Sequence, residues 1–138
     1  MIRFNNDYNH GALDSILSAL TATNADSFAG YGEDIWCQRA ETVIKQLVSR
    51  EDALIKFVPG ATQANIVAIA AALSPVQSVI AADTGHINCH EAASIESTGH
   101  KILGLPNTDG KLTSRQIAAC AAEYYEGGAP EYLTEPKL

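Results

Sequence analysis

The sequence predicts an α/β protein with a mainly parallel sheet, preceded by helices near the N-terminus. After residue 53, short apolar runs alternate three times with segments of helical composition, which is the pattern of strands joined by crossover helices. Hydrophobic residues make up 46% of the 138 residues and charged residues 18%, so the chain holds enough apolar material for a core. Aromatic residues make up only 7%, which favours packed helices over a β-sandwich.

Two amphipathic helices are predicted before the sheet begins. Leucine and isoleucine side chains recur at helical spacing from Leu13 to Leu20, which predicts the first helix. A second apolar stripe predicts a helix from about Asp34 to Ser49, with Asp34 as its N-cap. We therefore expect residues 1–52 to form an N-terminal arm with helices, and residues 53–138 to form an incomplete large domain.

Three short apolar runs predict the strands of the sheet, namely Leu54–Val58, Val79–Ala82 and Lys101–Leu105. The first run ends at Pro59-Gly60 and the third at Pro106, residues that interrupt regular structure. Such short apolar strands, buried on both faces, are typical of parallel sheets. We expect the last stretch, residues 127–138, to be a loop.

Three helices are predicted between and after these strands. The first, Ala61–Leu73, is rich in alanine, a strong helix former. The second covers His86–Thr98, with Gly99 as the left-handed residue that ends it. The third begins at a capping box that opens with Thr113 and continues to about Tyr125.

Charge and composition exclude several classes of function. The net charge is −7 and the isoelectric point is about 4.9, so we expect no nucleic-acid partner. No apolar run approaches the roughly 18 residues that span a bilayer, and the N-terminus lacks the blocks of a signal peptide. We therefore expect a cytoplasmic protein without a membrane partner. Three irregularly spaced cysteines predict neither a disulfide framework nor a zinc site.

The first candidate site is the turn Pro59-Gly60 and the helix start that follows it. The first backbone N–H groups of a helix have no intrahelical acceptor, and the helix dipole is positive there, so an anion is attracted. Thr62 adds a hydroxyl donor at the same place. The alternative is an ordinary capped helix after a strand-to-helix turn, which binds nothing.

The second candidate site is the polar cluster Asp83-Thr84-Gly85-His86, which follows a predicted buried strand. Open α/β sheets bind ligands at the carboxyl ends of their strands, where the ring of His86 could stack on an aromatic cofactor. The alternative is a histidine near a helix cap with no ligand. His90 lies one turn further on, but the pair lacks the glutamate of the zinc-protease motif, and we predict no metal site.

A third candidate is Tyr31, which stands between Gly30 and Gly32. Flanking glycines allow backbone paths that can aim the phenol into a site, whereas the alternative is a flexible loop before the next helix. The stretch Phe4–Tyr8 leaves the same choice open, between a turn that faces a ligand and an ordinary polar arm.

Taken together, these residues resemble the N-terminal part of the threonine aldolases, which are pyridoxal 5′-phosphate (PLP) lyases of fold type I, the aspartate aminotransferase fold. The resemblance covers nearly the whole chain and implies a partial three-layer αβα PLP-transferase large domain. Five stretches, in the order and spacing of the family, carry the resemblance. They are Phe4-x-Asn6-Asp7-Tyr8-x-x-Gly11, Gly30-Tyr31-Gly32-Glu33-Asp34, Gly60-Ala61-Thr62-Gln63-Ala64-Asn65, Ala82-Asp83-Thr84-Gly85-His86-Ile87-Asn88 and Thr98-Gly99-His100-Lys101.

The resemblance implies that a β-hydroxy-α-amino acid, such as threonine, is cleaved to glycine and an aldehyde. It places the PLP phosphate on the turn at Gly60, on the backbone amides of Ala61 and Thr62, and on the Thr62 hydroxyl. It implies that His86 is catalytic, because the matching family histidine stacks on the pyridine ring and lies near the substrate hydroxyl.

Two further residues are implied to bind the amino-acid substrate. Asn6 stands where the family has a serine close to the substrate carboxylate, and Tyr31 matches a tyrosine of the active-site loop. Asn6 and Ala61 both depart from the family pattern. Ala61 replaces a glycine of the phosphate turn, which is tolerable where only the backbone amide is used.

The family's Schiff-base lysine and the carboxylate that pairs with the pyridine nitrogen lie in downstream motifs that no part of this sequence matches. We therefore expect a truncated chain that is inactive by itself. Uncovered sheet edges and helix faces predict a homo-oligomer. Two alternatives stay open, namely a β-eliminating PLP lyase of the tyrosine or tryptophan type, and a non-catalytic remnant that binds a full-length partner.

Overall fold

The computed structural model describes residues 10–138, which form two compact units, one ending at Phe57 and the other extending from Val58 to Leu138. Within the described residues, no helix is both long enough and apolar enough to cross a membrane.

The first unit contains helices α1 (Asp14–Thr23) and α2 (Ile35–Leu47), close to the two predicted ranges. Asp34 is the N-cap of α2, as predicted. Its carboxylate accepts hydrogen bonds from the backbone N–H groups of Trp36, at 2.8 Å, and Cys37, at 2.9 Å. Two of the donors that a helix start leaves free are satisfied in this way.

The predicted strand at Leu54–Val58 is wrong. These residues belong to no helix or strand, and they pair with no strand in the described part of the chain. Leu54 is 81% exposed and Phe57 is 51% exposed, so the run is not buried. An apolar run becomes a strand only when a neighbouring strand satisfies its backbone groups, and residues 10–138 provide no such neighbour for this run.

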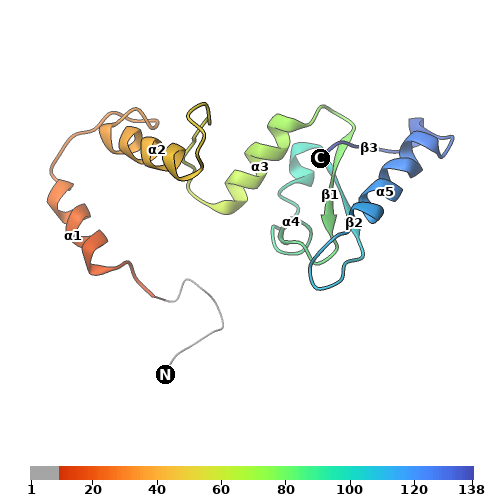
Figure 1. The fold of residues 1–138 in the computed structure, drawn as a ribbon, viewed down its shortest axis with the longest axis horizontal. Coiled ribbons are helices and arrows are strands. Elements are labelled where there is room, and N and C mark those ends of the chain that lie inside the picture. The colour runs from red at the N-terminus through yellow and green to blue at the C-terminus, as the bar shows by residue number, and fades with distance from the viewer. Residues whose placement is uncertain (1–9) are drawn as a thin grey trace, which may run out of the picture. The chain divides into compact units, whose positions relative to one another are not determined.

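The second unit contains a parallel sheet of three strands in the order β2-β1-β3. These are β1 (Gln77–Ala82), β2 (Lys101–Leu105) and β3 (Glu135–Pro136), of which the first two were predicted. Val79 of β1 is paired with Ile102 of β2, and Ser78 of β1 with Pro136 of β3. Strand β1 is hydrogen-bonded to both of the others, and all three are labelled in Figure 1. The predicted loop over residues 127–138 therefore contains a short strand that joins the sheet.

Helices α3 (Ala61–Ala72) and α5 (Ser114–Glu126) match their predicted ranges closely. The predicted capping box is confirmed, because the Thr113 hydroxyl accepts from the N–H of Gln116 while the Gln116 side chain accepts from the N–H of Thr113. This reciprocal pair satisfies two polar groups at the start of α5.

The predicted helix His86–Thr98 is wrong as a single element. Helix α4 (His86–Cys89) has one turn, and a short 3₁₀ helix (Glu96–Thr98) follows after an irregular segment. Ala92 and Ala93 have φ angles of 48° and 61°, in the left-handed region, which a continuing right-handed helix excludes. Gly99 ends the segment at φ 86°, as predicted.

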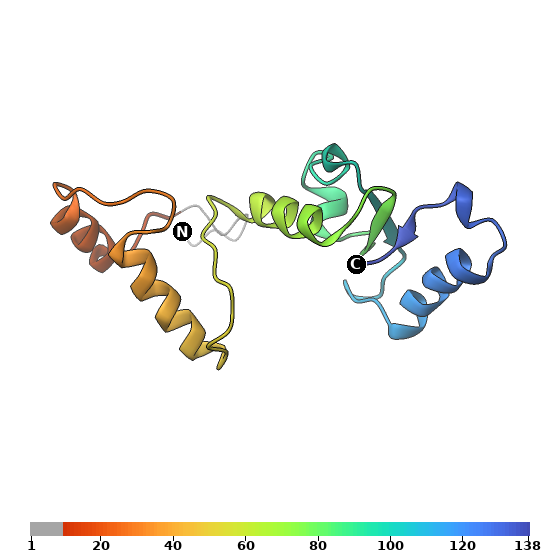
Figure 2. The ribbon, with the colours of Figure 1, turned by 90° about the horizontal axis from the view of Figure 1, so that it is seen from above.

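The sheet has helices on both faces. On one face, Val79 and Ile102 pack with the buried side chains of Ile69, Leu73 and Ile95 to form the core. In Figures 1 and 2, α3 and α4 lie on one side of β1 and β2, and α5 lies on the other side. This three-layer αβα arrangement with a parallel sheet confirms the predicted fold class.

Candidate functional site

The turn after β1 places His86 at the carboxyl end of the sheet. The N–H of Asp83 donates to the carbonyl oxygen of Leu105, at 2.8 Å, so the turn continues the pairing of β1 with β2. The N–H of Gly85 then donates to the carbonyl oxygen of Ala82, at 2.8 Å. A Cβ at Gly85 would lie 2.9 Å from that same oxygen, so the turn requires glycine.

The start of α3 offers unpaired backbone donors. Its N-cap is Gly60, which provides no side-chain cap, and the first turn holds no acidic residue. The N–H groups of Ala61, Thr62 and Gln63 have no acceptor among the described residues. Helices α2 and α5, by contrast, have side-chain caps. The start of α3 therefore keeps the donors and the positive dipole end that attract an anion.

A buried carboxylate joins α3 to His86. Oε1 of Glu91 accepts a hydrogen bond of 2.6 Å from the side-chain amide of Asn65, in the second turn of α3. The same oxygen lies 2.9 Å from Nδ1 of His86. The side chain of Glu91 is fully buried, whereas that of His86 is 61% exposed. Two hydrogen bonds thus connect the predicted phosphate helix to the predicted catalytic histidine.

The carboxylate of Glu91 is held in its ionised form. Burial by itself raises the pKa of this group, but hydrogen bonds from Asn65, Ser94 and His86 outweigh it, and the pKa lies below the ordinary value of 4.5. The Ser94 hydroxyl donates to Oε2, at 2.9 Å. A carboxylate that accepts several hydrogen bonds is stabilised relative to its protonated form.

His90 lies beside His86. Their ring centroids are 5.7 Å apart and the planes are tilted by 55°. In the part of the chain that the structure describes, no group of three or more histidine, cysteine or acidic side chains is placed to hold a metal ion. The two rings are thus close enough for contact between them.

Of the two predicted substrate-binding residues, Tyr31 and Asn6, only Tyr31 lies within the described residues. Tyr31 lies in the first unit, with a φ angle of 61° and a fully exposed side chain, followed by Gly32 at a φ of 81°. The left-handed backbone at both residues agrees with the unusual path that the flanking glycines predict. Asn6 lies outside the described residues.

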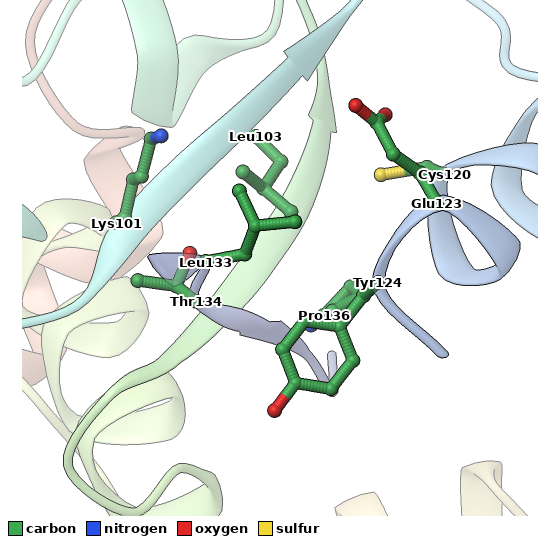
Figure 3. Close-up of a pocket in the computed structure, with 8 residues that line it drawn as sticks. All are labelled: Lys101, Leu103, Cys120, Glu123, Tyr124, Leu133, Thr134 and Pro136. Carbon is green, nitrogen blue, oxygen red and sulfur yellow. The ribbon is translucent and has the colours of Figure 1, made fainter. Parts of the chain in front are cut away.

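A separate hollow of about 150 Å³ lies on the other face of the sheet, between β2, α5 and the chain that leads into β3 (Figure 3). Leu103 and Leu133 line it, and Cys120 and Glu123 approach it from α5. Burial, and then the charge of Glu123, raise the pKa of the Cys120 thiol, so this thiol is a poor nucleophile. None of the predicted site residues lines this hollow.

Sequence reasoning missed the roles of Asn65 and Glu91. Both stand beside predicted site residues, but the hydrogen bond between them joins positions 26 residues apart. The only local indication was that Glu91 is an acidic residue five positions after His86. In the continuous helix that we expected, residues five positions apart do not face each other, so no contact was predicted.

Comparisons with known proteins place the chain in a family. A family model described as β-eliminating lyase matches residues 11–128. A low specificity L-threonine aldolase of Pseudomonas aeruginosa is 32% identical over 117 residues, which cover 83% of this chain and 34% of that protein. The solved structure of Leishmania major threonine aldolase matches with a TM-score of 0.88 and 38% identity, over 95% of this chain and 37% of that one. The chain thus spans about a third of the length of these relatives.

Proposed function

Because this chain belongs to the β-eliminating lyase family, we propose that it forms part of the active site of a PLP-dependent threonine aldolase. The reaction is the cleavage of a β-hydroxy-α-amino acid, such as threonine, to glycine and an aldehyde. The observation that carries the proposal is the hydrogen-bonded link from α3 through Glu91 to His86, which joins an anion-attracting helix start to an exposed imidazole. The likeness to two threonine aldolases favours this cleavage over β-elimination.

The residues at the start of α3 fit the phosphate of PLP. The N–H groups of Ala61 and Thr62 have no acceptor among residues 10–138, and Thr62 is exposed. Apart from its chain neighbours, no described residue lies within 4 Å of the position that a Cβ of Gly60 would take. A phosphate dianion there would gain charge-assisted hydrogen bonds and a favourable interaction with the helix dipole. The chemistry that the bound cofactor supplies is an electron sink for the electron pair released as the Cα–Cβ bond breaks.

His86 serves the substrate side of the same site. Its exposed ring can cover one face of an aromatic cofactor, and its Nε2 can accept the proton of the substrate β-hydroxyl. Removal of this proton allows the aldehyde carbonyl to form as the Cα–Cβ bond breaks. Asn6 and Tyr31 complete the proposal as contacts of the amino-acid substrate.

The 138-residue chain alone is proposed to bind the cofactor without turning over threonine. None of its five lysines stands in a stretch that resembles the family's lysine motif, and one of them, Lys45, is paired with Glu41 on α2 at 2.8 Å. After addition of PLP and reduction with borohydride, we expect no stoichiometric label on any single lysine and no glycine from threonine. One fully labelled lysine, or measurable glycine production, would contradict this part of the proposal.

The phosphate site is tested with pyridoxine 5′-phosphate, which lacks the aldehyde and therefore does not react with lysines. We expect Thr62→Ala to weaken its binding by about 10- to 100-fold, because a hydrogen bond to a charged group contributes about 1.5–3 kcal/mol. Fluorescence titration of the ligand measures the dissociation constant, and inorganic phosphate should compete.

The matched control is Thr42→Ala, on α2, whose hydroxyl donates to its own helix. This variant should bind pyridoxine 5′-phosphate as the unmodified chain does, and unphosphorylated pyridoxine should bind neither protein. Equal affinity of the Thr62→Ala and Thr42→Ala variants would refute the assignment of Thr62.

Self-association and a cytoplasmic location stay predictions from the sequence. The first is supported by apolar side chains of the helices in the first unit that remain exposed to solvent. Leu13 is 73% exposed, Leu20 is 61% exposed and Leu47 is 78% exposed. Contact with a second copy of the chain would remove such surface from water.

A further inference from the structure

The carboxylate of Glu91 can only accept hydrogen bonds, and this restricts the imidazole beside it. In its ionised form, Glu91 has no proton to donate to Nδ1 of His86, which lies 2.9 Å from Oε1. The hydrogen of this contact therefore belongs to Nδ1. A neutral imidazole holds one proton on its ring nitrogens, so Nε2 is left with a free lone pair.

Nε2 of His86 is the nitrogen that remains available to a ligand. The His86 side chain is 61% exposed, and no described residue makes a hydrogen bond to Nε2. The other nitrogen is occupied by a carboxylate that Asn65 and Ser94 hold from two further directions. The ring is thus anchored on its buried side and open on its exposed side.

We propose that Glu91 is a positioning residue that holds neutral His86 in the tautomer with its proton on Nδ1, so that Nε2 acts as the hydrogen-bond acceptor or base. The part played by Nε2 toward the substrate hydroxyl rests on the proposed aldolase function, whereas the tautomer does not. Asn65 extends the same constraint to α3, because it fixes the oxygen that Nδ1 contacts.

The choice of a carboxylate at position 91 supports this role over a purely structural one. A glutamine could also join Asn65, Ser94 and His86, and it would avoid the cost of burying a charge. A glutamine amide, however, can donate as well as accept, and with the side-chain amide of Asn65 turned over to accept from it, either tautomer of His86 would be permitted. Only an acceptor-only group removes this freedom.

The test is the tautomer of His86, observed through the ¹⁵N resonances of the imidazole rings in the full 138-residue chain. At about pH 9, where an ordinary imidazole is neutral, we expect a protonated Nδ1 and an unprotonated Nε2 in the unmodified chain. In Glu91→Gln, we expect a signal from the Nε2–H tautomer to appear, with the Nδ1–H population correspondingly reduced.

Two internal controls accompany this measurement. Nδ1 of His100 lies 3.2 Å from the carbonyl oxygen of Gln77, another acceptor-only group, so His100 should stay Nδ1–H in every variant. Ser94→Ala removes one hydrogen bond from Glu91 but leaves the contact with His86, so its His86 tautomer should match that of the unmodified chain.

An Nε2–H tautomer of His86 in the unmodified chain would overturn the proposal without any variant, even if Glu91→Gln failed to fold. An unchanged tautomer in folded Glu91→Gln would overturn it as well. Neither measurement needs PLP or threonine. The proposed tautomer of His86 can therefore be disproved while the proposed aldolase function still stands. That function fails instead if pyridoxine 5′-phosphate does not bind.

Discussion

Replacement of Ile95 by alanine is expected to lower the free energy of unfolding of residues 58–138 by about 2–5 kcal/mol. Ile95 is completely buried, and its side chain packs with Ile69, Val79 and Ile102 in the core on one face of the sheet. Truncation leaves a cavity that these neighbours fill only in part. Because a domain is stable by only about 5–15 kcal/mol, the loss is a large fraction of the total.

Amide hydrogen exchange of strand β1, which contributes Val79 to the core, measures this loss of stability. Protection of the β1 amides, such as that of Ile80, which donates to the carbonyl oxygen of Leu138 at 2.7 Å, should fall by about 30-fold or more. Trp36, the sole tryptophan of the chain, lies in the first unit, so its fluorescence reports on that unit separately.

The control for Ile95 is Ile117→Ala, which removes the same atoms from a side chain that is 43% exposed. This substitution should lower the free energy of unfolding by less than about 1 kcal/mol, because the Ile117 side chain buries less apolar surface on folding and its truncation leaves no closed cavity. Similar losses of β1 protection in the two variants would show that Ile95 is not the centre of the core.

Elements with strong local signals could be predicted from the sequence. Helices α2 and α5 begin where Asp34 and Thr113 predict, because a side-chain cap acts within the first turn of its own helix. Strand β2 covers the predicted residues Lys101–Leu105, a short apolar run that closely follows Gly99 and ends before Pro106.

Elements that depend on distant partners could not be predicted. Leu54–Val58 has the composition of a strand, but sheet pairing requires a neighbour, and composition does not specify one. Strand β3 pairs with β1 across more than 50 residues, through contacts such as the hydrogen bond from Gln77 to Glu135. Such pairings are set by the sheet as a whole rather than by the local sequence.

In the candidate site, too, some features could be predicted from the local sequence and others could not. The start of α3 follows from a glycine turn before an alanine-rich helix, so the position of this helix start could be predicted from the sequence. Glu91 could not, because the predicted helix ends at Cys89 and the irregular segment that follows, with left-handed backbone at Ala92 and Ala93, was not expected. Alanine gives no sign of such a backbone, since it is the residue that favours helices most.

The second large effect expected is loss of stability of residues 58–138 in acid. Two carboxylates join separate elements there, and each has a pKa below its ordinary value of 4.5 in the folded chain. Glu91 connects α3 to His86. The pKa of Glu135 is lowered first by the hydrogen bond from Tyr125, then by those from Gln77 and Lys137, against the opposing effect of burial.

The direction of the pH effect follows from these lowered pKa values. Where the folded chain holds a carboxylate at a lower pKa than the unfolded chain does, the unfolded chain binds more protons in acid. The stabilisation is therefore complete above about pH 4.5 and is lost as the pH falls through the lower, folded values. Protection factors of the β1 amides, corrected for intrinsic exchange, should be level near neutral pH and fall as the pH decreases below about 4.5.

The carboxylates responsible are identified by substitution. Combining Glu91→Gln with Glu135→Gln should lower β1 protection near neutral pH and flatten its fall in acid, because the two groups that take up protons on unfolding are gone. The control Glu96→Gln changes an exposed carboxylate that has no ion pair among the described residues, and it should keep the full dependence. An equally steep fall in the double variant would mean that other carboxylates set the acid stability of this unit, and that Glu91 and Glu135 contribute little to holding its layers together.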